Sequence, residues 1–159
     1  MYSFRYGGRR AFGREISGIF TRKTVRRATY LNHAPPLREP ADLAQHDILL
    51  SDDYQAKRQW QLQSAKEQIS VNLQPVLCSN NNPTLAMSAV AAHGIALLPD
   101  VVGASYCQLG LLQALLPEWH AKSAPVYLVF PQRAAMPRKY RAFIDFIVPA
   151  LQAILSAQP

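Results

Sequence analysis

The stretch SNNNPTLAMSAVAAHGIALLPD, from Ser79 to Asp100, has the most informative pattern in the chain. Pro83 suits the first turn of a helix, and the small and apolar residues up to His93 favour a helix packed closely against a sheet. Gly94 is expected to end that helix, and IALLP after it predicts a short central strand with apolar residues on both faces. Asp100 is then expected to cap a second short helix.

Strand and helix patterns alternate on both sides of this stretch. Strands are expected at YSFRY (2–6), EISGIF (15–20), DILL (47–50), KRQWQLQ (57–63), ISVNLQPVLCS (69–79) and APVYLVFP (124–131), with an edge strand in LLQALLPEW (111–119). Pro40 can begin a brief helix through Gln45. Apolar residues at helical spacing predict a C-terminal amphipathic helix, which Pro149 should kink or split: Tyr140, Phe143, Ile144, Ile147, Leu151 and Ile154. The alternation predicts an α/β fold with a mostly parallel sheet.

The net charge of +7 is concentrated at one end of the chain. Residues 1–27 hold eight basic side chains against the single acid Glu15, and these account for the whole excess. A basic segment of this kind suggests contact with nucleic acid, although charge runs are more often solvated faces. No apolar run approaches the roughly 20 residues that a membrane helix needs, so a cytoplasmic protein without membrane contact is expected.

The sequence offers little for catalysis or metal binding. The two cysteines, Cys78 and Cys107, have no CxxC spacing, and the four histidines have no metal-ligand spacing. Neither a nucleophile elbow nor a phosphate-binding glycine loop is present. We therefore expect no enzyme, no catalytic residue, no metal site and no cofactor.

Four pieces of the sequence resemble the effector-binding domain of LysR-type transcriptional regulators. They are YLNHAPPLREPADLAQH (30–46), NNNPTLAMSAVAAHGIALLPD (80–100), LLQALLPEW (111–119) and APVYLVFPQRAAMPRKYRAFIDFI (124–147), in the order and spacing of the family from about residue 26 to 157. The resemblance implies a periplasmic-binding-protein-like (type 2) α/β fold. Residues 35–120 would form one nearly complete subdomain, and residues 1–34 and 121–159 a partial second one.

The chain also departs from the family pattern. The family's helix-turn-helix, linker helix and opening half of the first subdomain have no counterpart in this sequence, so a truncated member is expected. The strand at 125–130 and the helix after it would then leave an apolar face uncovered, and such faces promote association.

The resemblance implies a small, often anionic effector held at helix N-termini in a cleft between subdomains, with Ser79–Thr84 as one wall. The first N–H groups of a helix lack internal partners and carry partial positive charge, which suits an anion. Asn82 is expected to cap the helix, which leaves Asn80 and Asn81 to contact the ligand beside Thr84. The alternative is a polar turn in which all three asparagines satisfy local backbone groups.

Arg27 and Thr29 are weaker candidates for the opposite wall of the cleft. Arg27 could pair with an anion, but a solvated arginine is the alternative. Thr29 is a second candidate, with a simple cap of the next short helix as its alternative.

The leading hypothesis is an effector-sensing and oligomerisation fragment of a LysR-type regulator that cannot bind an operator by itself. Its expected partners are a small-molecule effector and either a second copy or a full-length LysR-type regulator. Two alternatives stay open: a small nucleic-acid-binding protein that uses residues 1–27, and a non-functional gene remnant.

Overall fold

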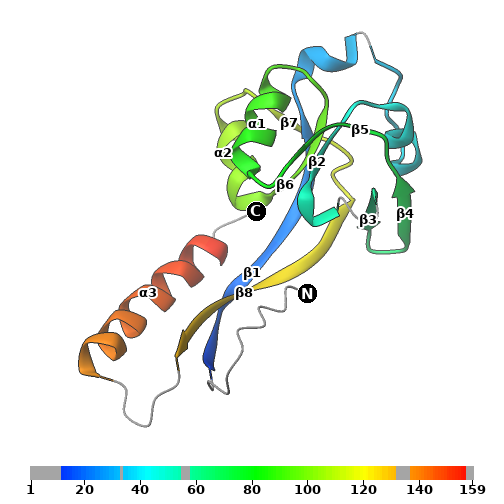
Figure 1. Ribbon diagram of the computed structural model, residues 1–159. Coiled ribbons are helices and arrows are strands. Elements are labelled where there is room, and N and C mark those ends of the chain that lie inside the picture. The colour runs from blue at the N-terminus through cyan, green and yellow to red at the C-terminus, as the bar shows by residue number, and fades with distance from the viewer. Residues whose placement is uncertain (1–11, 33, 55–57, 132–136, 157–159) are drawn as a thin grey trace. The chain divides into compact units, whose positions relative to one another are not determined.

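The computed structural model describes residues 12–32, 34–54, 58–131 and 137–156 (Figure 1). The chain divides into two compact units. The first unit takes its described residues from 12–19 and 125–156, and the second is Phe20–Ala124. The predicted strand YSFRY (2–6) lies outside the described residues.

The second unit is built on a sheet whose strands follow the order β4-β3-β8-β1-β6-β2-β5, with β7 paired to β1. The strands are β1 (Phe12–Arg26), β2 (Ile48–Ser51), β3 (Gln59–Gln63), β4 (Gln68–Asn72), β5 (Pro75–Ser79), β6 (Ile95–Pro99), β7 (Gln113–Ala114) and β8 (His120–Pro131). Every expected strand within the described residues is therefore found, and the segment 69–79 holds two of them.

The expectation of a mostly parallel sheet is wrong. Among the pairings described, β2 runs parallel to β5 and to β6. The pairs β1–β6, β1–β7, β3–β4 and β3–β8 are antiparallel. The parallel part is thus a block of three strands, β6-β2-β5, inside a mixed sheet.

Two buried clusters lie on the two faces of this sheet. Leu49 of β2 belongs to the cluster that α1 (Asn82–Val90) covers, whereas Ile48 and Leu50 belong to the cluster on the other face. Both β2 and β6 are buried along their whole length, and for β6 this confirms the prediction of a central strand with apolar residues on both faces. Figure 1 shows α1 and α2 (Asp100–Gln108) lying together on one side of the strands.

The end of α1 differs from the prediction. The helix stops at Val90 because Ala92, not Gly94, adopts the left-handed conformation, with φ 63°. The N–H of Ala92 donates to the Ala89 carbonyl at 3.0 Å, and that of His93 donates to the Ser88 carbonyl at 3.1 Å. These two bonds make a Schellman motif with alanine at the position where glycine is usual.

Gly94 has a different role in the same turn. Its φ of 151° disfavours any side chain, and a Cβ there would collide with the carbonyl group of Asp47. The same Asp47 carbonyl accepts a hydrogen bond from the N–H of Ile95 at 2.9 Å. Glycine therefore allows β6 to begin directly beside the residue that precedes β2.

The start of α2 also corrects the prediction. Pro99 occupies the N-cap position, and Asp100 is the first residue of the helix. One Asp100 carboxylate oxygen accepts from the N–H of Val101 at 2.9 Å, and the other accepts from the Thr21 hydroxyl at 2.7 Å. The acid therefore ties α2 to β1 in place of capping the helix.

Three short 3₁₀ helices complete the second unit: η1 (Ala28–Asn32), η2 (Pro40–Gln45) and η3 (Asp52–Tyr54). The brief helix predicted from Pro40 to Gln45 is confirmed as η2.

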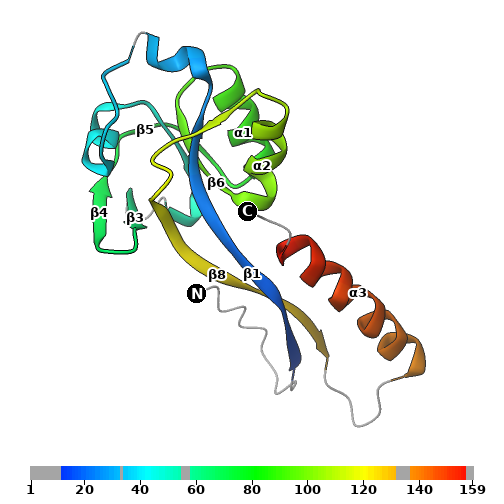
Figure 2. The same cartoon turned by 180° about the vertical axis from the view of Figure 1, so that it is seen from behind.

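The first unit contains the described start of β1, the end of β8 and α3 (Arg138–Ser156), which runs alongside these strands in Figures 1 and 2. α3 continues through Pro149 and is not split there. Of the six residues expected on its apolar face, Ile144 is buried, whereas Tyr140, Phe143 and Ile154 are exposed. None of the described helices is long and apolar enough to cross a membrane.

Candidate functional site

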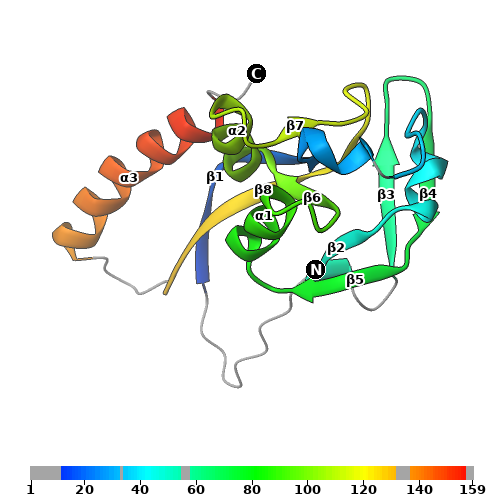
Figure 3. The same ribbon diagram turned by 90° about the horizontal axis from the view of Figure 1, so that it is seen from above.

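The three parallel strands of the second unit end at the same edge of the sheet. β6, β2 and β5 are neighbours, and the register places Ser51, the last residue of β2, opposite Ser79, the last residue of β5. α1 follows β5 at this edge (Figure 3). In open α/β sheets, ligands bind outside the carboxyl ends of parallel strands, so this edge is the first place to look for a site.

The hydroxyls of Ser51 and Ser79 point to the side of the sheet that α1 covers. Residues two apart on a strand share a face, and both Leu49 and Leu77 pack in the cluster beneath α1. Ser51 is only 8% exposed. No hydrogen bond of its hydroxyl is found within the described residues, and this hydroxyl is not one of the fully buried unpartnered polar atoms, so it remains accessible. The Ser79 hydroxyl accepts from the N–H of Asn81 at 3.1 Å.

Ser51 was missed by sequence reasoning. The sequence feature that could have indicated it is its position directly after a buried strand, because ligands bind outside the carboxyl ends of strands in α/β sheets.

Asn81, rather than Asn82, caps α1. Its side-chain oxygen accepts from the N–H of Thr84 at 3.0 Å and from the Thr84 hydroxyl at 3.2 Å. A cap side chain reaches the N–H three residues further on, which from Asn82 would be that of Leu85. The Leu85 N–H instead donates to the Asn81 carbonyl at 3.2 Å, so the helix begins one residue earlier and Asn82 is its first residue.

The three asparagines therefore do different things. The oxygen of Asn81 is engaged in the cap, as the interpretation of a polar turn predicted for all three. The side chains of Asn80 and Asn82 make no hydrogen bond within the described residues, and Asn80 is exposed. Within the described residues, the asparagine side chains without a hydrogen bond are thus those of Asn80 and Asn82, whereas the sequence led us to expect Asn80 and Asn81.

The starts of the two helices differ in charge. α2 has Asp100 in its first turn, whereas α1 has no acidic residue there. Pro83 has no N–H and that of Thr84 is held by the cap, so Asn82 supplies the remaining donor of the first turn. The α1 start therefore keeps the positive end of its dipole without a carboxylate from the chain, an arrangement that suits an external anion.

Arg27 and Thr29 lie apart from these asparagines. The Arg27 guanidinium donates to the carbonyl of Val90 at 2.9 Å, at the other end of α1. Asn82 and Val90 are separated by about 12 Å along a helix that rises 1.5 Å per residue. Thr29 lies inside η1, not before it as a cap would, and lines a separate pocket with Tyr30 and Asp47.

Part of the basic segment 1–27 is built into the sheet. Residues 12–26 form β1, and residues 1–11 lie outside the described part of the chain. Arg26 is 9% exposed and donates to the carbonyls of Arg27 and Ala28, both at 2.9 Å, and burial lowers its pKa. The Arg22 guanidinium lies over the Tyr54 ring, 5.8 Å from its centroid. These two arginines are therefore placed by contacts within the domain.

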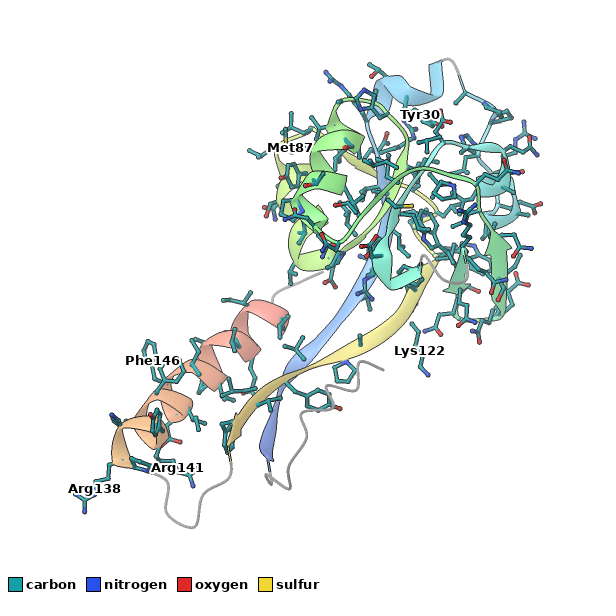
Figure 4. The ribbon with its side chains drawn as sticks, viewed as in Figure 1. Tyr30, Met87, Lys122, Arg138, Arg141 and Phe146 are labelled. Atoms are coloured by element: carbon teal, nitrogen blue, oxygen red, sulfur yellow. The ribbon has the colours of Figure 1, made fainter. Side chains whose placement is uncertain are left out.

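Three shallow pockets are lined by described residues. One of about 330 Å³ lies between η1 and η2, and one of about 510 Å³ lies between the start of β5 and the end of α1. The third, of about 450 Å³, lies on the outer face of α1 and includes Thr84 and Met87, the latter labelled in Figure 4. Within the described ranges, no group of three or more His, Cys, Asp or Glu side chains could hold a metal ion.

Comparison with known proteins assigns the chain to a protein family. The family model described as LysR substrate binding domain matches residues 24–152. The chain therefore belongs to the LysR substrate-binding domain family, and its fold is the periplasmic-binding-protein-like type 2 fold of LysR-type regulatory domains.

Individual relatives agree with this assignment. The HTH-type transcriptional regulator PtxR of Pseudomonas aeruginosa is 28% identical over 143 residues, which are 89% of this chain and 46% of PtxR. The putative LysR family substrate binding domain-containing protein YagP of Escherichia coli is 26% identical over 92 residues, which are 58% of this chain and 68% of YagP. The chain spans about half the length of PtxR.

Solved structures match over a similar share of the chain. The regulatory domain of the C227S variant of AphB from Vibrio vulnificus superposes with a TM-score of 0.77 at 25% identity, covering 91% of this chain and 73% of that one. Full-length AphB of Vibrio cholerae gives a TM-score of 0.77 at 22% identity, covering 87% of this chain and 47% of that one. LysR-type regulatory domains bind small-molecule effectors and form oligomers. Effector sensing is therefore the role of the family to which this chain belongs.

Proposed function

We propose that the start of α1, together with Ser51 and Ser79, binds a carboxylate of a small effector. The observation that carries this proposal is Ser51: the residue is only 8% exposed, no hydrogen bond of its hydroxyl is found within the described residues, and it lies on the side of the sheet where α1 begins. The Ser51 hydroxyl is not one of the fully buried unpartnered polar atoms, so it stays accessible at this edge and can donate a hydrogen bond to a ligand.

The chemistry of the edge supports an anion over a cation. The groups around the α1 start can all donate hydrogen bonds, and the first turn of α1 holds no acidic residue: they are the Ser51 and Ser79 hydroxyls, the amide groups of Asn80 and Asn82, and the N–H of Asn82. Carboxylates accept several hydrogen bonds at once, and the helix dipole adds a favourable field. Asn81 contributes by fixing the turn.

The wider function follows from the family. We propose that the two compact units correspond to the two regulatory subdomains, whose boundaries were predicted at residues 34 and 120. We further propose that the protein works in the cytoplasm as a non-enzymatic effector sensor, paired with a second copy or with a full-length LysR-type regulator. Direct sequence-specific DNA binding is not part of this proposal, since Arg22 and Arg26 of the basic segment belong to β1.

The experiment is a thermal-shift and calorimetry screen of small carboxylic acids, each paired with its neutral amide. A ligand that binds only the folded protein raises the melting temperature by mass action. We expect at least one acid to bind while its amide does not.

The decisive variants are Asn81→Asp and Ser51→Ala. Asp caps a helix as well as Asn does, so N81D keeps α1 but adds a negative charge beside the carboxylate; we expect unchanged stability and at least tenfold weaker binding. S51A should weaken binding by a similar factor, and Ser70→Ala, on the exposed side of β4, is the matched control. Equal affinity of wild type and N81D would refute an anion at this edge, and binding of amides and acids alike would replace the carboxylate by a neutral ligand.

A further inference from the structure

His46 is the most unusual polar side chain in the second unit. It follows η2 and is only 5% exposed, yet neither of its ring nitrogens has a hydrogen-bond partner among the described residues. A neutral imidazole has one donor and one acceptor, and both are unsatisfied here. Protonation would add a charge to a buried ring, which is more costly still.

The ring is part of a small assembly that joins η1, η2 and β2. The His46 and Tyr30 rings lie 5.9 Å apart between centroids, at 45° to each other. The Tyr30 hydroxyl accepts from the N–H of Asp47 at 3.0 Å, and the Asp47 carbonyl accepts from the N–H of Ile95. Tyr30 therefore contacts both His46 and the residue that follows it.

This assembly borders the pocket of about 330 Å³. The pocket is lined by Thr29, Tyr30, Ala34, Pro35, Gln45, Asp47 and Ala92. Both sequence neighbours of His46 and its ring partner are thus pocket walls. A movement of the His46 ring would change its contact with Tyr30, which is one of these walls.

The charges around His46 come from three elements. Asp42 in η2 and Asp47 after it favour the protonated ring, whereas Arg26 in β1 opposes it. Tyr30 in η1 faces the ring as a phenol whose own pKa is raised by burial. Desolvation is the largest influence and lowers the pKa of His46 below its ordinary value of 6.5. Arg26 is itself buried and its Nε lacks a partner, so a protonated His46 would be a second cation in the same region.

We propose that His46 is a proton-sensitive joint: when it is protonated, its ring leaves the buried position, separates η1 from η2 and opens the pocket beside Tyr30 and Asp47. This device is independent of effector binding at the α1 start. A group with a lowered pKa in the folded state binds fewer protons than in the unfolded state. The stabilisation is therefore complete above about pH 6.5 and is lost as the pH falls through the lower pKa of the folded protein.

The test compares the full chain with His46→Leu and with His93→Gln, a control that changes an exposed histidine. Hydrogen exchange at the Asp47 N–H, corrected for its intrinsic pH dependence, reports opening of the joint. In wild type and H93Q, exchange should speed up by as much as tenfold per pH unit below about pH 6.5, the limit when opening is coupled to the uptake of one proton. In H46L this added acceleration should be absent.

A direct titration of the wild-type protein tests the proposal even if H46L does not fold. The imidazole signal of His46 in the wild-type protein, followed by NMR, should titrate below pH 6.5 and move together with the exchange of the Asp47 amide. The proposal is overturned if His46 titrates at or above 6.5. It is also overturned if folded H46L and wild type show the same acid-dependent opening.

Discussion

Replacing Ala92 by glycine should stabilise the protein, because the residue sits in the Schellman turn with φ 63°. A side chain in the left-handed region costs about 1–2 kcal/mol, which glycine avoids. Glycine loses about 0.5–1 kcal/mol through the greater freedom of the unfolded chain. The net gain is therefore about 0.5–1 kcal/mol, or about 1–4 °C in the melting temperature of a protein of this size.

Ala91→Gly is the matched control for that prediction. Ala91 is the neighbouring exposed residue, and its φ of −76° is unstrained. Glycine there should cost about 0.5–1 kcal/mol, so the two variants should shift the melting temperature in opposite directions. Thermal denaturation followed by circular dichroism measures both. The reasoning is refuted if Ala92→Gly lowers the melting temperature as Ala91→Gly does, because the left-handed turn would then carry no strain.

Three further changes test the turn, the cap and the exposed face of α3. Gly94→Ala should cost more than about 2 kcal/mol in urea unfolding, since its Cβ would collide with the Asp47 carbonyl and its φ is unfavourable; a loss below 0.5 kcal/mol would contradict the close approach. Asn81→Ala should cost about 1 kcal/mol in the same assay and Asn81→Ser much less, because serine can also cap; equal losses would show that the cap contributes nothing. Phe146→Asp should reduce concentration-dependent light scattering at an unchanged melting temperature, because the ring is 73% exposed (Figure 4); unchanged scattering would exclude that ring from any association.

The buried strands were predictable from the sequence because their signal is local. DILL and IALLP are short apolar runs next to polar or glycine residues, and such runs become strands buried on both faces. The body of α1 was predictable for the same reason. Strand direction was not, since nothing within the β1 sequence shows that it runs antiparallel to β6.

The details of the site depended on contacts that the sequence hides. Asn80, Asn81 and Asn82 are all good caps by residue type, and the choice of Asn81 is made by the position of the turn after β5. Arg27 donates to the carbonyl of Val90, 63 residues further along the chain, and no local sequence pattern predicts such a contact. Ser51 becomes a candidate site residue only because the β2–β5 pairing places it opposite Ser79, and this pairing is not visible in the sequence.

The elements of the proposed site all belong to the second unit, and this unit also holds both buried clusters. Among the described side chains of the first unit, only Ile144 and Val148 are buried apolar ones. Opening of a region requires less free energy where fewer apolar contacts are lost. The edge formed by β2, β5 and α1 is therefore held by the better-packed part of the chain, which fixes Ser51 and the α1 cap in place before any ligand arrives. A preorganised edge of this kind binds an anion with little ordering cost, so its affinity should depend mainly on the hydrogen bond that S51A removes and on the local charge that N81D changes.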